Sequence, residues 1–325
     1  MLSDSASGRS VPNYAPVKVG LVGAGQWSAT MHAPLHSAGA ETELTGVWSA
    51  HADNAARLAR QHGVPAFASF KELLASCEAV DFAVPPPVQA ELAPQAADAG
   101  LALLLEKPLG ASMAQASAVA EAVRRNGVAT AVVLTKRYHP RTRDFLAAAA
   151  ELRSKAPILG VSASYLHGGF LNSGFLNAQG RQGWRDEYGP LHDLGPHLLD
   201  LMDLAAGTIE AVSADGTKDY VALTTHHDGG ATGQAAISGS VQLAQVRTTL
   251  SVYSAKGTLD YTTAGMDHAE CWPVLRREFA DAVRLGTPAT ADAERALKVQ
   301  ALVEAAAQSV REQRLVRVAE ILTTA

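Results

Sequence analysis

The chain carries near its start the stretch Val17-Lys18-Val19-Gly20-Leu21-Val22-Gly23-Ala24-Gly25-Gln26-Trp27-Ser28. This stretch has the pattern of an apolar strand, a glycine turn and the first turn of a helix. Glycines permit a tight turn and let backbone N–H groups approach a pyrophosphate, and the helix start adds unpaired N–H donors. The stretch therefore indicates a dinucleotide-binding site, with Ser28 standing where a third glycine is usual.

Strand-like runs alternate with alanine-rich helical segments from about residue 17 to residue 135. Such alternation implies right-handed crossovers and a doubly wound parallel sheet. Pro34 lies in the first helical segment and is expected to kink or shorten it. We expect strands at 17–22, 43–49, 80–84, 101–105 and 128–134, and helices at 54–62, 70–75, 89–99 and 112–126.

The pattern changes after about residue 157, where strands are joined by short turns. Gly229-Gly230 and Lys256-Gly257 are typical of hairpins, which require antiparallel pairing. We expect an α+β domain with a mostly antiparallel open sheet and helices on one side. The face of this sheet that carries no helices must pack against another surface, so we expect a homodimer or homotetramer formed through this sheet. The expected strands are 158–166, 211–214, 220–226, 234–241, 247–253 and 258–261, and the helices are 191–206, 273–285 and 292–311, with Asp292 as an N-cap.

Size and composition limit the classes of function. The chain has 325 residues, of which 47% are hydrophobic and 18% charged, enough for two domains with sizeable cores. We expect a mobile tail at 1–16, a dinucleotide-binding domain at 17–138 and a substrate-binding and oligomerisation domain at 139–325. The net charge of −5 argues against nucleic-acid binding, and no apolar run is long enough to indicate a membrane span. The tail lacks the apolar segment of a secretory signal. The two cysteines do not have the spacing of a disulfide framework or a metal site, and free thiols are typical of the reducing cytoplasm, where we expect the protein.

The motif Glu106-Lys107-Pro108 directly follows the expected strand 101–105. Loops at the carboxyl ends of parallel strands face the ligand crevice of such sheets. Lys107 is therefore a candidate to contact the nicotinamide or the substrate. The alternative is an ordinary surface lysine before a proline turn.

Asp193 and His197 are four residues apart and would share one face of a helix. A carboxylate beside an imidazole raises its basicity and fixes its tautomer, which suits the proton partner of a hydride transfer. Pro196 requires the helix to start close by, and Asp200 competes as the partner of His197. The alternative is a capped helix start with a buried core histidine. A metal site built from His192, Asp193, His197 and His167 has no zinc spacing, so we expect no metal.

Taken in order, the motifs Gly23-Ala24-Gly25, Val80–Pro86, Glu106-Lys107-Pro108 and Gly189…Asp193…His197…Asp200 resemble those of the Gfo/Idh/MocA oxidoreductases. That family includes glucose–fructose oxidoreductase and inositol dehydrogenases. The resemblance implies an N-terminal Rossmann domain. It also implies catalytic roles for Lys107, Asp193 and His197, with substrate contacts from these three and from Trp184-Arg185. Arg137-Tyr138 fall where the family often has an arginine–aromatic pair, while Gln89 and Pro190 depart from the family pattern.

The expected cofactor is NAD(P), with a preference for NADP. No carboxylate follows the second strand until Asp53, and Ser49 and His51, assisted by Arg57, could accept a 2′-phosphate. The expected cofactor-binding residues are Gly23, Ala24, Gly25, Gln26, Trp27, Ser49, His51, Pro85, Glu106 and Lys107.

These expectations combine into an NAD(P)-dependent oxidoreductase that moves a hydride between nicotinamide and a carbinol or carbonyl carbon of a sugar, polyol or cyclitol. Two alternatives remain open. One is a lyase or hydrolase-type enzyme that uses bound NAD(P) transiently, and the other is a non-enzymatic NAD(P)-sensing regulator or scaffold. The polar segment 167–188, with Asn172, Asn177, Gln179 and Arg185, is expected to line the substrate crevice.

Overall fold

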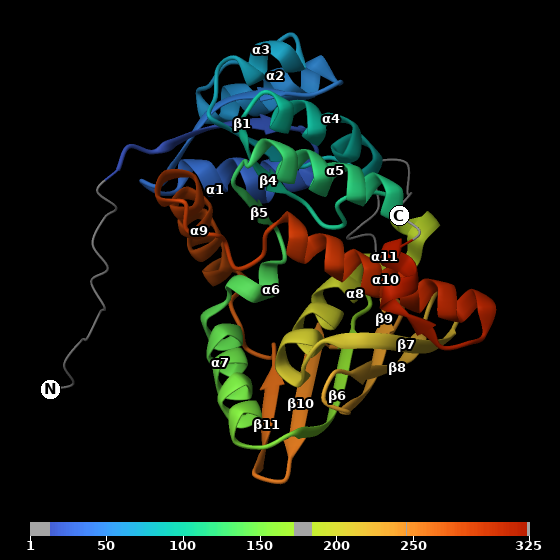
Figure 1. The fold of residues 1–325 in the computed structure, drawn as a ribbon. Coiled ribbons are helices and arrows are strands. Elements are labelled where there is room, and N and C mark those ends of the chain that lie inside the picture. The colour runs from blue at the N-terminus through green and yellow to red at the C-terminus, as the bar shows by residue number, and fades with distance from the viewer. Residues whose placement is uncertain (1–13, 172–183, 245, 324–325) are drawn as a thin grey trace, which may run out of the picture.

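The computed structural model describes residues 14–171, 184–244 and 246–323, which form two sheets and their covering helices (Figure 1). One sheet has five strands in the order β2-β1-β3-β4-β5. The other has seven strands in the order β11-β10-β6-β9-β8-β7-β12. The expected α/β class, with a doubly wound parallel sheet followed by a mostly antiparallel one, is confirmed.

The first sheet is parallel throughout. Strands β3 and β4 are buried along their whole length, as expected for a parallel sheet covered on both faces. Two of its helices are N-capped by serine side chains: Ser69 and Ser112 accept backbone N–H bonds at the starts of α3 and α5. The elements are β1 (Val17–Val22), β2 (Thr42–Trp48), α2 (Ala52–His62), α3 (Phe70–Leu74), β3 (Ala79–Phe82), α4 (Pro86–Asp98), β4 (Ala102–Leu105), α5 (Met113–Asn126) and β5 (Thr130–Val132).

The helix after the glycine turn is interrupted, as Pro34 led us to expect. It begins as a π-helical segment, η1 (Ser28–His32), and continues as the short helix α1 (Ala33–Ser37). Pro34 lies at the first positions of α1, where a residue without an N–H is tolerated. The change of helix type brings His32 and His36 into the interior, where both are buried.

The second sheet is mostly antiparallel, as expected, and contains one parallel pair of strands. The predicted hairpins are present, but β6 and β9 run parallel. Helix α8 and two strands separate these neighbours along the chain, so no short turn constrains their direction. The strands are β6 (Ile158–Leu166), β7 (Ile209–Gly216), β8 (Val221–His227), β9 (Thr232–Ser238), β10 (Arg247–Ser254), β11 (Gly257–Thr262) and β12 (Val316–Arg317).

Helices gather on one side of the second sheet (Figure 1). Helix α8 packs on β6 and β9, α10 on β7, and α7 on β11. The sequence analysis did not predict α7, whose start is capped by the His139 side chain. The remaining helices are α6 (Thr135–Tyr138), α7 (Pro140–Lys155), α8 (Trp184–Ala206), η3 (His268–Glu270), α9 (Cys271–Leu285), α10 (Ala293–Glu312) and α11 (Val318–Thr323).

The chain returns to the first sheet after completing most of the second. Leu275 and Phe279 of α9 are buried in the same apolar cluster as residues of β1, β3, β4 and β5. Helix α9 also holds the residues just before β1, because Tyr14 donates to Asp281 at 2.6 Å and Arg284 donates to the Pro16 carbonyl at 2.8 Å. Residues 1–13 of the predicted tail lie outside the described residues. No helix in the described ranges has the length and apolarity needed to cross a membrane.

Candidate active site

The two glycines of the turn after β1 have different surroundings. Gly23 has a φ of 113°, and a Cβ there would lie 2.3 Å from the Ala83 carbonyl oxygen. Gly25 has open space where a Cβ would be, with no heavy atom within 4 Å. The turn is therefore pressed against β3 on one side and open on the other, which fits the approach of a dinucleotide pyrophosphate to backbone N–H groups. Of the other two candidates at this turn, Gln26 is exposed and Trp27 is 48% exposed.

The turn after β2 carries hydroxyl and imidazole groups in place of a carboxylate. The Ser49 hydroxyl accepts the backbone N–H of His51 at 3.2 Å, and His51 is the N-cap residue of α2. His51 and Arg57 are exposed. The nearest acidic residue in sequence, Asp53, lies in the first turn of α2.

Gln89 of α4 clamps the loop that contains Lys107. Its side chain is fully buried, and its amide Nε2 donates to the carbonyl oxygens of Glu106 at 2.8 Å and Leu109 at 3.2 Å. Its Oε1 accepts the backbone N–H of Glu106 at 2.8 Å. A single side chain thus satisfies backbone groups on both sides of Lys107, so this departure from the family pattern has a structural role. Pro85, a candidate from the same region, is the N-cap residue of α4.

Two buried histidines share the carboxylate of Asp81 beneath the glycine turn. His32 Nδ1 lies 2.9 Å from Asp81 Oδ2, and His36 Nε2 lies 3.0 Å from the same oxygen. The other nitrogen of His32 lies 3.1 Å from Glu106 Oε1, which also accepts the Trp27 indole N–H at 2.8 Å. This network joins the glycine turn to the loop that carries Lys107.

The charges of this network are strongly coupled. Burial alone would lower the pKa of His32, but attraction by Asp81 and hydrogen bonds to Asp81 and Glu106 raise it to about 10. Burial alone would raise the pKa of Asp81, but the two histidines lower it to about 2. His32 is therefore an imidazolium at neutral pH, with both ring nitrogens donating.

Lys107 meets Asp193 at the junction of the two sheets. Its ammonium Nζ lies 2.6 Å from Asp193 Oδ1 and donates to the Asp193 carbonyl oxygen at 2.9 Å. The side chains are 12% and 5% exposed, so the ion pair is largely shielded from water. Pro196 has no N–H to donate to the His192 carbonyl, so the helical ladder is broken beside the carbonyl that Lys107 contacts.

His197 is buried near this ion pair, but not as we expected. Its Nδ1 has no hydrogen-bond partner among the described residues. Burial, followed by the positive charges of Lys107 and Lys136, holds the pKa of His197 well below 6.5. Asp193 raises the pKa of His197, as we expected, but burial and the two lysines outweigh this effect, and the Asp193 carboxylate pairs with Lys107.

Asp200 does not serve as the partner of His197 either. It accepts Arg137 Nη1 at 3.1 Å and Arg295 Nε at 2.7 Å. Tyr138 is fully buried and donates to the Val132 carbonyl at 3.0 Å. Arg137 and Tyr138 thus tie helices and strands together rather than lining the site.

The sequence analysis missed a second lysine beside His197. Lys136 is 4% exposed, and its Nζ lies 4.1 Å from the centre of the Tyr165 ring. The same ring lies 6.3 Å from the His197 ring and 5.7 Å from the His167 ring, measured between centroids. The available signal was that Lys136 lies in the segment after the last parallel strand, which faces the ligand crevice, but Arg137 shares this position.

Comparison with known proteins now identifies the family. Residues 17–134 match the model described as an oxidoreductase family with an NAD-binding Rossmann fold, and residues 158–260 match the GFO/IDH/MocA C-terminal domain. The chain belongs to the Gfo/Idh/MocA oxidoreductases.

Individual members of the family are distant from this chain. Oxidoreductase P35 of Formosa agariphila is 26% identical over 208 residues, which cover 62% of this chain and 64% of the relative. Glucose-6-phosphate 3-dehydrogenase of Bacillus subtilis is 27% identical over 191 residues, 57% of this chain and 52% of the relative. The matches thus span less than two thirds of either relative. The crystal structure of GenD2 from gentamicin A biosynthesis in complex with NAD shares the fold, with a TM-score of 0.83, 24% identity and coverage of 95% of this chain and 98% of that one.

Some expected site residues of this Gfo/Idh/MocA chain cannot be placed. Trp184 and Arg185 begin α8, but their side chains lie outside the described residues, as do Asn172, Asn177 and Gln179. Gly189 kinks α8 with a φ of 68°, in the left-handed region that favours glycine. The kink lets the helix restart at Pro190, so Pro196 is an interior proline rather than the first-turn residue that we expected.

The histidines considered for a metal have separate neighbours. His192 Nε2, on α8, lies 3.6 Å from Glu304 Oε1, on α10. The His167 Nδ1 accepts the backbone N–H of Gly169 at 2.8 Å. Within the described ranges, no cluster of three or more metal-ligating side chains occurs.

Proposed function

We propose that this chain is an NAD(P)-dependent dehydrogenase or reductase acting on a CH–OH or C=O group of a sugar, polyol or cyclitol. The observation that carries this proposal is the meeting of Lys107, Asp193 and His197 at the carboxyl edge of a sheet that begins with a dinucleotide-type glycine turn. Family membership supports the reaction class. The name of the relative glucose-6-phosphate 3-dehydrogenase supports a sugar-like substrate.

The three side chains have complementary roles in this proposal. His197 is neutral at physiological pH because its pKa is lowered, so its imidazole can accept the proton of a substrate hydroxyl. Lys107 donates a hydrogen bond to the same oxygen and stabilises its negative charge. Asp193 positions the Lys107 ammonium. A nicotinamide, when bound, accepts or supplies the hydride, and Gly23 to Trp27, Pro85 and Glu106 are the residues that would hold the dinucleotide.

We further propose that NADP is preferred over NAD. A carboxylate at the turn after β2 would repel a 2′-phosphate, and the turn has Ser49 and His51 in its place. Arg57 is exposed one turn into α2 and can add a positive charge. The free thiols of Cys77 and Cys271 suit action in the reducing cytoplasm.

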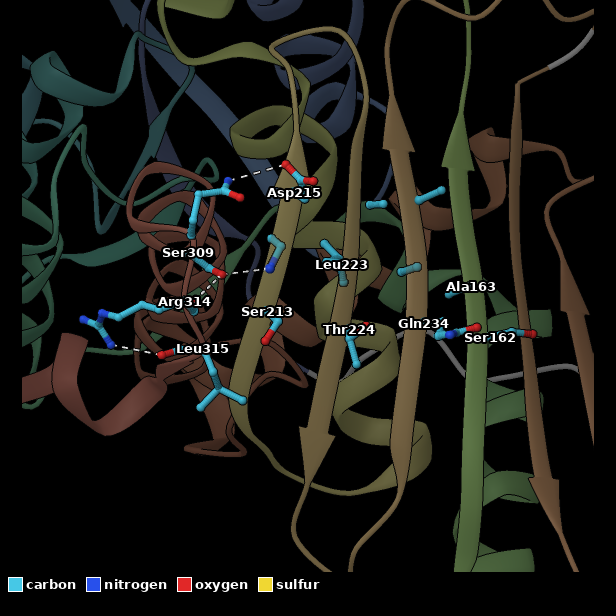
Figure 2. A pocket seen from close by; sticks show the side chains of 15 residues that line it. Ser162, Ala163, Ser213, Asp215, Leu223, Thr224, Gln234, Ser309, Arg314 and Leu315 are labelled. Atoms are coloured by element: carbon cyan, nitrogen blue, oxygen red, sulfur yellow. Dashed lines mark hydrogen bonds between the residues drawn. The ribbon is translucent and has the colours of Figure 1, made fainter.

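The open face of the second sheet is the surface through which we propose that two copies associate. Its outward side chains are small and polar, and they line a hollow of about 730 Å³ between the strands and the end of α10 (Figure 2). At one rim of this hollow, Ser309 donates to the Arg314 carbonyl and accepts the backbone N–H of Ala214 at 2.8 Å. Flat faces of this kind pack well against a second sheet. The lining includes Ser162, Ser213, Ala222, Thr224, Gln234 and Ala236.

The proposed reaction is tested by incubating the full chain with NAD or NADP and a panel of sugars, polyols and cyclitols. Nicotinamide absorbance and product formation are followed together. We expect stoichiometric cofactor reduction with at least one substrate. Substrate consumption without net cofactor change would support the transient-redox alternative, and tight cofactor binding without turnover of any panel member would support a regulator. Light scattering on the same sample tests the homo-oligomer.

A further inference from the structure

The ammonium of Lys136 is the charged group of the site for which the proposed reaction has no use. Lys136 is more deeply buried than Lys107, yet no carboxylate of the described residues lies within ion-pair distance of its Nζ. Its contact is the face of Tyr165 at 4.1 Å. Burial of an ammonium without a counter-ion is unfavourable, and a ring face offsets that penalty only in part.

The described groups around Lys136 leave the site short of negative charge. The carboxylate that acts on it from α8 is Asp193, which is already neutralised by Lys107. The charge of Lys136 in turn lowers the pKa of His167, His197 and His268, each of which is already lowered by burial. These imidazoles are therefore mostly neutral at physiological pH, and among the described residues Lys136 is a cation without a carboxylate partner.

The Tyr165 ring lies beside both this cation and His197. Lys136 lies over the ring of Tyr165, and the His197 ring lies 6.3 Å from the same ring centre. Because both side chains adjoin one ring, a molecule whose hydroxyl contacts His197 and Lys107 can place a substituent a few bonds away near Lys136. A monosaccharide is large enough to reach both positions.

We propose that Lys136 is a specificity-determining residue that binds an anionic substituent, a carboxylate or a phosphate, on the sugar or polyol substrate. The substrate then supplies the counter-ion that the described part of the protein does not. This proposal rests on the proposed function for the position of the reacting carbon. It narrows the substrate class from sugars in general to uronates, aldonates or sugar phosphates.

The test measures binding to the full chain loaded with cofactor, using calorimetry and matched ligands. Glucose, glucuronate and glucose 6-phosphate form one set, and the corresponding galactose and mannose derivatives form two more. We expect at least one anionic member to bind tenfold or more tightly than its neutral counterpart. The carboxylate and phosphate arms distinguish the two sources of the anion. Failure of every anionic member to bind more tightly than its neutral counterpart, including the absence of any binding, overturns the proposal.

Variants separate the charge of Lys136 from its packing. Lys136→Met removes the charge and is expected to abolish the anion preference, whereas Lys136→Arg is expected to retain most of it. Lys298→Met is the matched control, because it removes the same charge from a lysine of α10 that is paired with Asp203 of α8. If Lys136→Met does not fold, Lys136→Arg and the salt dependence of wild-type binding remain decisive, since a preference indifferent to salt would contradict a charge contact.

The pH dependence of binding gives an independent check. Burial lowers the pKa of Lys136 to about 8, so anion affinity should fall as the pH rises through about 8. A pH-independent preference from pH 7 to about 9 would contradict the proposal. Because binding is measured without turnover, an anion preference without hydride transfer would refute the proposed reaction and leave the Lys136 site intact. The titratable groups that face Lys136 are Tyr165, Asp193, Cys271, His167, His197 and His268.

Discussion

The ammonium of Lys107 and the carboxylate of Asp193 are 2.6 Å apart although 86 residues separate them in the chain. Lys107 belongs to the loop after β4 of the first sheet, and Asp193 belongs to α8, which packs on the second sheet. The pair therefore joins the two halves of the molecule at the point where a substrate and a nicotinamide would meet. Its orientation fixes the direction in which Lys107 can donate its remaining proton.

Replacing Asp193 by Asn should impair chemistry more than folding. The amide can still accept a hydrogen bond from Lys107 but carries no charge to hold the ammonium in place. We expect kcat to fall by about 10²-fold and the free energy of unfolding to fall by about 1–3 kcal/mol. Cofactor affinity, measured by fluorescence titration, should change by less than about threefold, since Asp193 is not among the residues expected to hold the dinucleotide. A full-rate variant would show that the pair is only structural.

His197 should give the oxidation rate an acidic limb at unusually low pH. Burial lowers its pKa, so the basic form prevails above that lowered value and is lost only as the pH falls through it. We expect kcat for oxidation to hold from neutral pH to below 6.5 before it declines. His197→Gln should reduce kcat by about 10²- to 10⁴-fold and remove the limb. An unchanged pH profile in this variant would assign the proton transfer to another group.

Gln89 should stabilise the loop that carries Lys107. Gln89→Leu leaves the buried backbone N–H and carbonyl groups of that loop without partners. We expect a loss of about 2–4 kcal/mol in the free energy of unfolding and a higher KM for the cofactor. Gln95→Leu in the same helix is the control, because its exposed amide bonds only within the helix. Equal effects of the two substitutions would remove the assigned role of Gln89.

The His32–Asp81 pair should make stability depend on pH in a defined direction. The pKa of His32 is raised to about 10, so its contribution to the free energy of unfolding is complete below about pH 6.5 and is lost as the pH rises towards 10. The pKa of Asp81 is lowered to about 2, so its contribution is complete above about 3.8 and is lost as the pH falls towards 2. On the alkaline side, the free energy of unfolding should fall by at most about 1.4 kcal/mol per pH unit, and His32→Gln should flatten this slope. His62→Gln, at the partly exposed end of α2, should leave that slope in place.

Ser49 should control the choice between the two dinucleotides. A carboxylate at this position can accept the ribose hydroxyls of NAD and repels the 2′-phosphate of NADP. We expect Ser49→Asp to change the ratio of kcat/KM for NADP over NAD by at least about tenfold in favour of NAD. A wild-type enzyme that already prefers NAD would refute the NADP proposal before any variant is made.

The elements that were predicted well from sequence are those defined by local patterns. The apolar strand and glycine turn at 17–28 depend on neighbouring residues alone, and β6 was predicted with its observed bounds. The N-cap at Asp292 was likewise predicted, and its side chain accepts the Arg295 backbone N–H at 2.8 Å. In each case the sequence pattern and the structural element that it predicts lie within a few residues of each other.

The features that sequence did not predict depend on how distant segments pack. The spacing of Asp193 and His197 suggested a direct pair, but spacing along one helix carries no information on Lys107 arriving from the other sheet. Lys136 gave no signal that set it apart from its neighbour Arg137, and only the position of Tyr165 shows that it faces the site. The parallel pairing of β6 and β9 likewise follows from the crossover through α8, which no turn motif records.

The most direct measurement of the central claim is the single-turnover rate of hydride transfer in cofactor-loaded wild type, Lys107→Met and His197→Gln, followed by nicotinamide absorbance with one active substrate. We predict that each substitution slows the transfer by at least about 10²-fold while the dinucleotide stays bound. Transfer at the wild-type rate in either variant would contradict the claim that these two side chains act together on the reacting oxygen.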